Sequence, residues 1–307
     1  MAEIVVVGSI NMDIVTRTER FPTPGETLYA SSTGFYPGGK GANQAVAASR
    51  LGANVAMIGA VGGDAFGVDI VRGLSRDGID TRGVITVSEA ATGVAIITVN
   101  AQGENSILLS PGANVQFSAA AVNANALPWD QCRVVLLQNE IAPVTNRNVI
   151  LKAAERGIRV FYNPAPAFPM DDEVLMCIDT LVLNEHEAGV ISGISVEDER
   201  SAESAVNALI ERGARSVVLT LGSQGVLYRG GIGAPIRLPA FQVAATDTTA
   251  AGDTFIGALA VSVMEGKPME DALRFAQAAA ALSVTKQGAQ SSIPSRRLVK
   301  SFLVSRA

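Results

Sequence analysis

One stretch of the sequence combines residue types that could transfer a phosphoryl group. It runs from Asp247 to Phe255 and leads into an apolar run, 255–264, which predicts a helix. The start of a helix leaves backbone N–H groups free to receive an anion, and Gly252, without a Cβ, would let a ligand approach them closely. Asp253 falls in the first helical turn, so we expect its carboxylate beside the anion. Phosphoryl transfer needs both parts: N–H groups that stabilise the transferred group and a carboxylate that takes a proton from the attacking hydroxyl.

Asp253 also has a structural interpretation. An aspartate near a helix start is common, because it accepts hydrogen bonds from free N–H groups and suits the helix dipole. From this stretch alone the structural interpretation comes first. The catalytic interpretation gains its weight from the motifs elsewhere in the chain.

Composition limits the class of protein. The chain has 307 residues, 48% of them hydrophobic, which is enough to fill a large core, and α/β folds of this length often form one unit. A net charge of −5 argues against nucleic acid or an anionic membrane as the main partner. Cys132 and Cys177 lie far apart and predict free thiols in a reducing compartment. The single histidine, His186, excludes a histidine-rich metal site.

The amino terminus shows no targeting signal. It lacks the basic region and the long apolar run of a signal peptide. No stretch approaches the roughly 20 apolar residues of a membrane span. We therefore expect a cytoplasmic protein without a membrane partner.

Short buried strands alternate with helices along the chain, which predicts an α/β fold with a doubly wound, mostly parallel sheet. The expected strands are 4–7, 54–62, 134–138, 159–162, 180–183 and 216–219. The expected helices are 45–51, 64–77, 143–156, 198–212, 255–264 and 269–284. Two further segments, at about 13–36 and 92–110, predict about four strands outside the main sheet.

Polar side chains gather where these strands end. They are Asn11, Asp13, Glu140, Asn184, Glu187 and Thr220. Any one of them could be a turn or a cap, but six at the edge where open α/β sheets bind ligands favour a binding site. A glycine-rich loop, 37–44, adds backbone amides together with Lys40 and Asn43 as donors. The dinucleotide-binding fingerprint and the Walker A order are both absent.

Four motifs together resemble those of the ribokinase-like carbohydrate kinases. They are the glycine-rich loop 38–43, the pair Asn184 and Glu187, the loop 220–225, and the segment 247–255. They follow the family's order and spacing across nearly the whole chain, and 8–13 and 21–27 also match. The resemblance implies a single Rossmann-like kinase domain over 1–307, with a small β-sheet lid at about 13–36 and 92–110. Family members dimerise through interlocked lids, which implies a homodimer.

The resemblance also implies an activity, the phosphorylation of D-ribose at its 5-hydroxyl by ATP. Asp253 would be the general base, and the backbone of Ala250, Ala251, Gly252 and Asp253 would form the anion hole. The sugar would be held by Asn11, Asp13, Gly39, Lys40, Asn43, Glu140 and Asp253. Asn184 and Glu187 would organise Mg²⁺ and phosphate. The nucleotide would be flanked by Thr220, Gly222, Ser223, Gly225 and Gln277, with Gly252 at its phosphates.

The same resemblance implies a potassium site beside the anion hole. Its members would be Asp247, Thr249, Val284, Gln287, Ala289 and Ser292. Carbonyl oxygens with one carboxylate suit a weakly hydrated monovalent cation. Such a cation would act by fixing the loop that shapes the anion hole.

The residue types narrow the substrate within this family. The carboxylates of Asp13 and Glu140 can accept hydrogen bonds from hydroxyl pairs and would repel a phosphorylated sugar. A nucleoside would need an apolar shelf for its base, and the lid strands carry few aromatic residues, mainly Phe35 and Tyr36. A free small sugar is therefore preferred. Deoxyribose, fructose and nucleoside kinases remain as alternatives, together with a catalytically silent sugar-binding protein.

Overall fold

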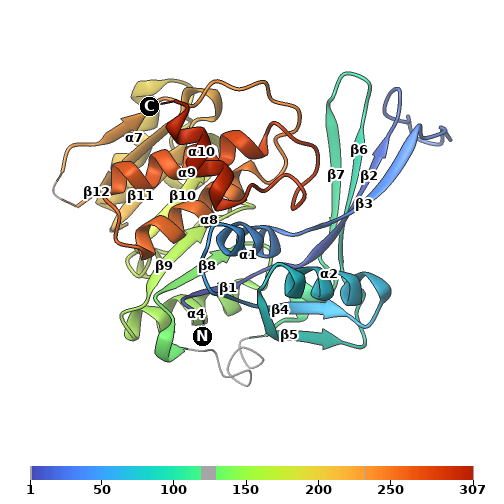
Figure 1. The fold of residues 1–307 in the computed structure, drawn as a ribbon, viewed down its shortest axis with the longest axis horizontal. Helices are drawn as coiled ribbons and strands as arrows, with labels where there is room; N and C mark the ends of the chain where they lie inside the picture. The colour runs from blue at the N-terminus through green and yellow to red at the C-terminus, as the bar shows by residue number, and fades with distance from the viewer. Residues whose placement is uncertain (1, 119–128, 232, 307) are drawn as a thin grey trace.

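A nine-stranded sheet forms the centre of the computed structural model, which describes residues 2–118, 129–231 and 233–306 (Figure 1). The strand order is β13-β12-β11-β10-β9-β8-β1-β4-β5, parallel from β11 to β5, with β12 and β13 antiparallel at one edge. The strands are β1 Ile4–Val7, β4 Val55–Gly62, β5 Asp80–Val87, β8 Val134–Gln138, β9 Arg159–Asn163, β10 Thr180–Asn184, β11 Ser216–Thr220, β12 Val226–Gly230 and β13 Ile236–Leu238. The predicted doubly wound, mostly parallel sheet is confirmed.

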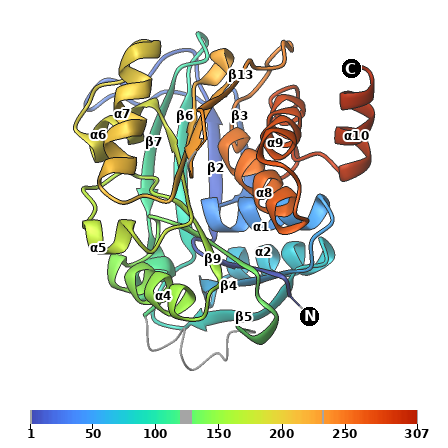
Figure 2. The same ribbon diagram turned by 90° about the vertical axis from the view of Figure 1, so that its left-hand side faces the viewer.

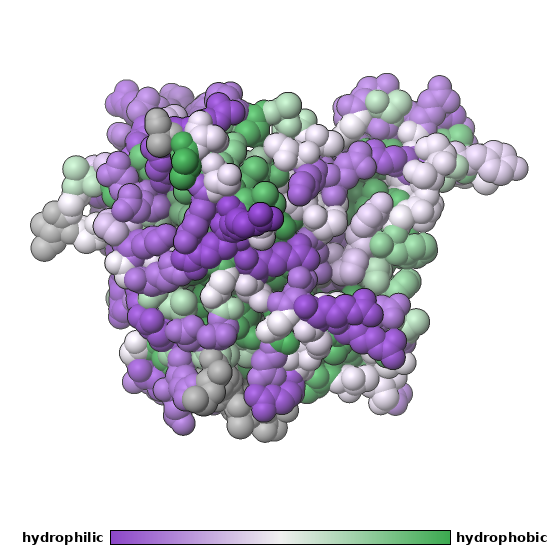
Figure 3. Space-filling model, in the orientation of Figure 1, coloured by the Kyte–Doolittle hydropathy of each residue, from purple (hydrophilic) through white to green (hydrophobic). Residues whose placement is uncertain are grey.

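Helices cover both faces of this sheet (Figure 2). One layer contains α1 Lys40–Arg50, α2 Ala65–Arg76, α8 Ala251–Met264, α9 Met269–Ser283 and α10 Arg296–Val304. The other contains α4 Pro143–Glu155, α5 Asp172–Leu175, α6 Glu185–Ser192 and α7 Glu199–Glu211. Strand β1 shows why the central strands are apolar throughout: Ile4 and Val6 join one core, and Val5 and Val7 join the other. Hydrophilic side chains form a band across the outer helices in Figure 3.

A second, four-stranded sheet projects from the main body at the right of Figure 1. It is formed by β3 Ser32–Gly38, β2 Asn11–Arg17, β6 Gly93–Val99 and β7 Asn105–Ser110, in that order. The two strands expected near 13–36 and the hairpin expected near 92–110 are confirmed. Strand β2 follows β1 after only three residues, so the chain passes directly from the centre of the main sheet into the second sheet.

Two helices begin earlier than predicted. The expectation of a loop over 37–44 and a helix over 45–51 is wrong for 40–44, which form the first turn of α1. Gly39 causes this: its φ of 88° turns the chain sharply, and a Cβ there would lie 2.7 Å from the backbone nitrogen of Asn11. The central helix α8 begins at Ala251 rather than at 255, and Asp253 lies in its first turn as predicted.

The sequence patterns missed β5, β12, β13, α5, α6 and α10. Among the helices within the described ranges, none is long and apolar enough to cross a membrane.

Candidate active site

A cavity of about 220 Å³ opens at the carboxyl edge of the main sheet. Its walls come from the ends of β9, β10 and β11 and from the starts of α1, α6 and α8. The predicted site residues that line it are Lys40, Asn184, Glu187, Thr220, Ala250, Ala251, Gly252 and Asp253. These predicted residues come from four separate segments of the chain and meet at one place.

Asp253 is buried in this cavity wall, and two side-chain amides hold its carboxylate. Asn43 Nδ2 donates to Oδ2 and Gln44 Nε2 donates to Oδ1, each at 3.0 Å. Each oxygen therefore keeps capacity to accept a proton from a substrate hydroxyl. A residue that only capped its helix would bond to the N–H groups of its own first turn, whereas Asp253 bonds to α1.

Small residues allow α1 and α8 to approach closely enough for this contact. A Cβ at Gly257 would lie 2.6 Å from the Cβ of Ala47, so only glycine fits there without displacement. Gly257 stands one turn after Asp253, and Ala47 stands one turn after Asn43, so each pair shares a helix face. The close contact between Gly257 and Ala47 therefore positions the hydrogen bond between Asp253 and Asn43, one turn earlier in each helix.

The start of α8 has a strained backbone. Ala250 has φ 59° and ψ 13°, and within the described part of the chain no other non-glycine residue has a positive φ. The left-handed conformation costs about 1–2 kcal/mol in such a residue, and strain of this kind gathers at functional sites. The N–H of Ala251 donates to the carbonyl of Thr248 at 3.2 Å. The N–H groups of Gly252 and Asp253 have no acceptor among the described residues, which leaves them free to donate to an anion.

Asp13 lies on β2 with its carboxylate buried, and it accepts no hydrogen bond from the described residues. Burial raises the pKa of Asp13 to about 7, the carboxylates of Glu140 and Asp253 add to the rise, and Lys40 opposes it. Gly38 on the paired strand makes room, because a Cβ there would lie 2.2 Å from Asp13 Oδ2. A buried carboxylate without protein partners is a strong acceptor for ligand hydroxyl groups.

Glu140 is held in place by its neighbours. Its Oε2 accepts from Ser9 Oγ at 2.6 Å and from the N–H of Lys40 at 3.3 Å. Burial lowers the pKa of the Lys40 amine, but nearby carboxylates, led by Asp253 and Glu140, more than offset this and raise it. Lys40 therefore remains charged beside the cavity.

Asn11 has its amide orientation fixed by Asn114, a residue that sequence reasoning missed. Asn114 Nδ2 donates to Asn11 Oδ1 at 2.7 Å, and the Asn114 side chain also bonds to both the N–H and the carbonyl of Ile10. The Asn11 oxygen is thus engaged, and its NH₂ group is the part left to donate to a ligand. Asn114 is 103 residues away in sequence from Asn11, so no local pattern could have indicated it.

Asn184 and Glu187 form a reciprocal cap at the start of α6. Glu187 N–H donates to Asn184 Oδ1 at 2.8 Å, and Asn184 N–H donates to Glu187 Oε2 at 3.0 Å. Asn163 Nδ2 adds a second hydrogen bond to Oε2, at 3.2 Å. Burial raises the pKa of Glu187, although the bond from Asn184 and the charge of Lys40 oppose it. Within the described ranges no cluster of three metal-binding side chains occurs, so oxygen ligands from this pair fit Mg²⁺ only together with phosphate and water.

Five other residues were expected to flank a nucleotide: Thr220, Gly222, Ser223, Gly225 and Gln277. Of these, Gly225 and Gln277 lie beside β13 rather than in the cavity wall. Thr220 alone among them lines the cavity, with its hydroxyl on the carbonyl of Leu183 at 3.1 Å. Gly222 and Ser223 form a short 3-10 turn after β11. Gly225 packs against Leu238: a Cβ at Gly225 would lie 2.0 Å from the carbonyl oxygen of Leu238. Gln277 on α9 donates to that same carbonyl at 3.3 Å and to the carbonyl of Pro239 at 3.2 Å.

The residues expected to bind potassium meet in two groups. Asp247 accepts hydrogen bonds from Thr249 N–H at 2.9 Å and from Gly288 N–H at 2.9 Å, while its own N–H donates to the Val284 carbonyl at 3.2 Å. Burial raises the pKa of Asp247, but these hydrogen bonds outweigh it and lower the pKa. Ser292 Oγ donates to the carbonyl of Ala289 at 2.8 Å, and the carbonyl of Gln287 accepts from Ser291 Oγ at 2.9 Å. The donor set, one carboxylate with carbonyl and hydroxyl oxygens, fits a monovalent cation.

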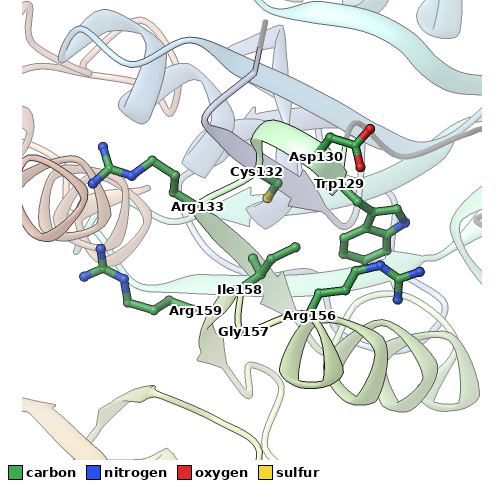
Figure 4. Close-up of a pocket in the computed structure, with 8 residues that line it drawn as sticks. All are labelled: Trp129, Asp130, Cys132, Arg133, Arg156, Gly157, Ile158 and Arg159. Atoms are coloured by element: carbon green, nitrogen blue, oxygen red, sulfur yellow. The ribbon is translucent and has the colours of Figure 1, made fainter.

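A larger hollow, of about 480 Å³, lies at the opposite edge of the sheet, where β8 and β9 begin (Figure 4). Three arginines, Arg133, Arg156 and Arg159, line it together with one carboxylate, Asp130. The guanidinium of Arg156 lies over the ring of Trp129, 5.2 Å from its centre. This hollow contains none of the predicted site residues, so chemistry rather than volume identifies the active site.

Comparison with known proteins agrees with this geometry. A family model described as pfkB family carbohydrate kinase matches residues 1–296. Ribokinase from Haemophilus influenzae is 44% identical over 302 residues, 98% of each chain, and a deoxyribokinase from Salmonella typhi is 37% identical over 302 residues, again 98% of each. The structure of Arabidopsis thaliana ribokinase complexed with ribose and ATP superposes with a TM-score of 0.91 at 35% identity, covering 98% of both chains. The chain belongs to the pfkB family of carbohydrate kinases.

Proposed function

We propose that this kinase transfers the γ-phosphoryl group of ATP to the 5-hydroxyl of D-ribose. One observation carries the proposal: Asp253 is held by two amides beside the N–H donors at the start of α8, and its charge acts on the buried carboxylate of Asp13. A base, an anion hole and an acceptor for sugar hydroxyls thus lie in one site. Relatives named ribokinase, one of them 44% identical, support the same substrate.

In this mechanism the sugar is bound by complementary polar groups. Asp13 and Glu140 accept from its hydroxyls, and the NH₂ group of Asn11 donates to it. Asn43 Oδ1 is buried and has no partner among the described residues, so a sugar hydroxyl would satisfy it. Gly39 and Lys40 would close the same side of the site.

The chemical step uses the start of α8. Asp253 takes the proton of the 5-hydroxyl, and the freed oxygen forms a bond to the γ-phosphorus as the bond to the β–γ bridging oxygen breaks and ADP leaves. The N–H groups of Gly252 and Asp253 stabilise charge on the transferred group, and Lys40 adds a positive charge. Mg²⁺, when bound near Asn184 and Glu187, would supply further neutralisation of phosphate charge. The 222–225 loop and Gln277 would shape the nucleotide side.

A monovalent cation near Asp247 would stabilise the strained turn at Ala250. Asp247 bonds to Thr249 directly before that turn, so a cation held there would favour the conformation that exposes the anion-hole donors. Potassium is proposed because the oxygen donors carry a single carboxylate charge.

ADP release with different acceptors tests the proposed function. D-ribose, 2-deoxyribose, D-fructose and adenosine would each be supplied with ATP and Mg²⁺, with and without potassium. We expect the highest kcat/KM on D-ribose, and higher turnover with potassium than in potassium-free, sodium-free buffer. A preference for 2-deoxyribose would move the protein to the activity named for its Salmonella typhi relative. Turnover on none of the four would favour a silent sugar-binding protein, and equal turnover without potassium would remove the cation site.

We further propose that the second sheet is the lid of this kinase domain and joins two copies in the cytoplasm. Strand register aligns Phe35, Ile14, Ile96 and Leu108 in one row across its four strands. Three of these side chains are exposed: Phe35 by 57%, Ile96 by 45% and Leu108 by 71%. An apolar row of this kind is typical of a surface that packs against a partner, and the same sheet carries Asp13, so pairing would stabilise a lid over the sugar.

Leu108→Asp is expected to convert the dimer to a monomer, because two carboxylates would be buried without partners at the contact. Sedimentation velocity would measure the mass against the 31.8 kDa of one chain. Val144→Asp is the matched control, since Val144 on α4 is 61% exposed and lies outside the lid. A wild-type protein that stays monomeric at micromolar concentration would contradict the lid interface.

A further inference from the structure

We propose that Gln44 and Gln138 are positioning residues that hold the Asp253 carboxylate in its reactive orientation. This inference rests on the proposed function, because it assigns a second layer to the same general base. Neither glutamine was indicated by the sequence motifs as a site residue. Both side chains are fully buried.

The contacts form a chain from the main sheet to the base. Gln138 is the last residue of β8, and its Nε2 donates to Gln44 Oε1 at 2.7 Å. Gln44 lies in the first turn of α1, and its Nε2 donates to Asp253 Oδ1 at 3.0 Å. The central strand β8 therefore reaches the start of α8 through two amides.

The donor and acceptor groups allow this chain of hydrogen bonds only one direction. An ionised carboxylate has only acceptors, so Gln44 must turn its NH₂ group toward Asp253. The Gln44 oxygen then faces Gln138, and Gln138 must turn its own NH₂ group toward Gln44. Without Gln138, the Gln44 amide could rotate and place an oxygen against the carboxylate.

The outer end of the chain is confined by the backbone. Gln138 Oε1 is buried without a partner among the described residues, and a Cβ at Gly8 would lie 2.0 Å from it. The glycine after β1 thus leaves space for this amide. A buried polar atom without a partner is costly, so an apolar side chain would suit a purely structural position better, and the amide has value for what it orients.

Gln138→Met tests the role without touching substrate or Asp253. The thioether has a similar shape but cannot donate, so Gln44 loses the contact that sets its orientation. We expect kcat to fall roughly tenfold to a hundredfold, the usual scale for such supporting residues, with KM for ribose and for ATP nearly unchanged. Asn146→Leu is the matched control. Asn146 lies on α4 and is also buried, and its Nδ2 donates to the backbone carbonyl of Gln138 with a distance of 2.7 Å. That variant should lose thermal stability but keep kcat.

A double-mutant cycle separates positioning from folding. In the Asp253→Asn background the residual turnover no longer depends on a carboxylate, so Gln138→Met should cause no further loss. The same fractional loss in both backgrounds would overturn the positioning role, and so would an unchanged kcat in Gln138→Met alone. The proposed general base is judged separately, from wild type against Asp253→Asn, so failure of one proposal is distinguishable from failure of the other.

Discussion

Asp253→Asn is expected to lower kcat by about 10²–10⁴-fold, the scale on which positioned acid–base groups contribute. The substituted side chain keeps nearly the same shape and stays within reach of the amides of Asn43 and Gln44. It cannot take the proton of the sugar hydroxyl, so the loss falls on the chemical step. Nucleotide binding should persist, because the N–H donors at the start of α8 belong to the backbone.

The experiment pairs kinetics with a binding measurement. ADP release gives kcat, calorimetric titration gives the affinity for ATP, and circular dichroism checks the fold. Asp271→Asn provides the control, because Asp271 also lies in the first turn of a helix, α9, but is exposed and outside the cavity. Near wild-type turnover in Asp253→Asn would return this residue to the structural interpretation. An equal loss in Asp271→Asn would show that helix capping explains the effect.

Local pattern predicted those parts of the fold that bury many apolar residues in a short span. β1, β4 and β8 are buried at every position, so short, largely apolar runs were sufficient to locate them. β5 has mixed polar and apolar residues that are half-buried or exposed, and it lies at the edge of the sheet beside β4. It lacks the continuous apolar run of a central strand, which is why it was missed.

The candidate site likewise contains residues that the sequence indicated and residues that it did not. Asp253 was found because a helix start, a glycine and a carboxylate stand together in the sequence. The supporting amides were not, since Gln138 and Gln44 are 94 residues apart and meet only when β8 and α1 pack together. Ala250 was expected in the anion hole, but its left-handed backbone was not indicated, because the surrounding structure rather than the residue type imposes that conformation. Motifs therefore indicate the reacting groups, and tertiary packing supplies what orients them.

Asp13→Asn is expected to make the free protein more stable at neutral pH while weakening ribose binding. The folded pKa of Asp13, about 7, is raised above its ordinary value of 3.8. The folded state therefore holds this proton more tightly than the unfolded chain. The stability that this bound proton contributes is fully present below about pH 4 and is lost as pH rises toward 7. Over that range the free energy of unfolding falls by up to about 4 kcal/mol. Asparagine removes that loss, so the variant should gain Tm at pH 8 and little at pH 4.

The same substitution removes an acceptor for the sugar hydroxyls. Losing a hydrogen bond to a charged group costs about 1.5–3 kcal/mol, so the affinity for ribose should fall by roughly ten- to a hundredfold. In the wild type, ribose binding should weaken as pH falls below 7, because Asp13 then becomes protonated. Calorimetric titration between pH 6 and 8 would measure this slope, and the variant should have lost it.

Asp64→Asn gives a control of opposite sign. Burial raises the pKa of the Asp64 carboxyl, but hydrogen bonds from Thr92 and Gly67 outweigh it and lower the pKa. Its contribution to stability is present above the unfolded pKa and is lost as pH falls, so its removal should lower Tm at pH 8. If Asp13→Asn changed Tm equally at pH 4 and pH 8, burial of its charge would not be the cause. A Tm gain in Asp13→Asn that is confined to higher pH would mean that the Asp13 carboxylate serves binding and lowers the stability of the free enzyme.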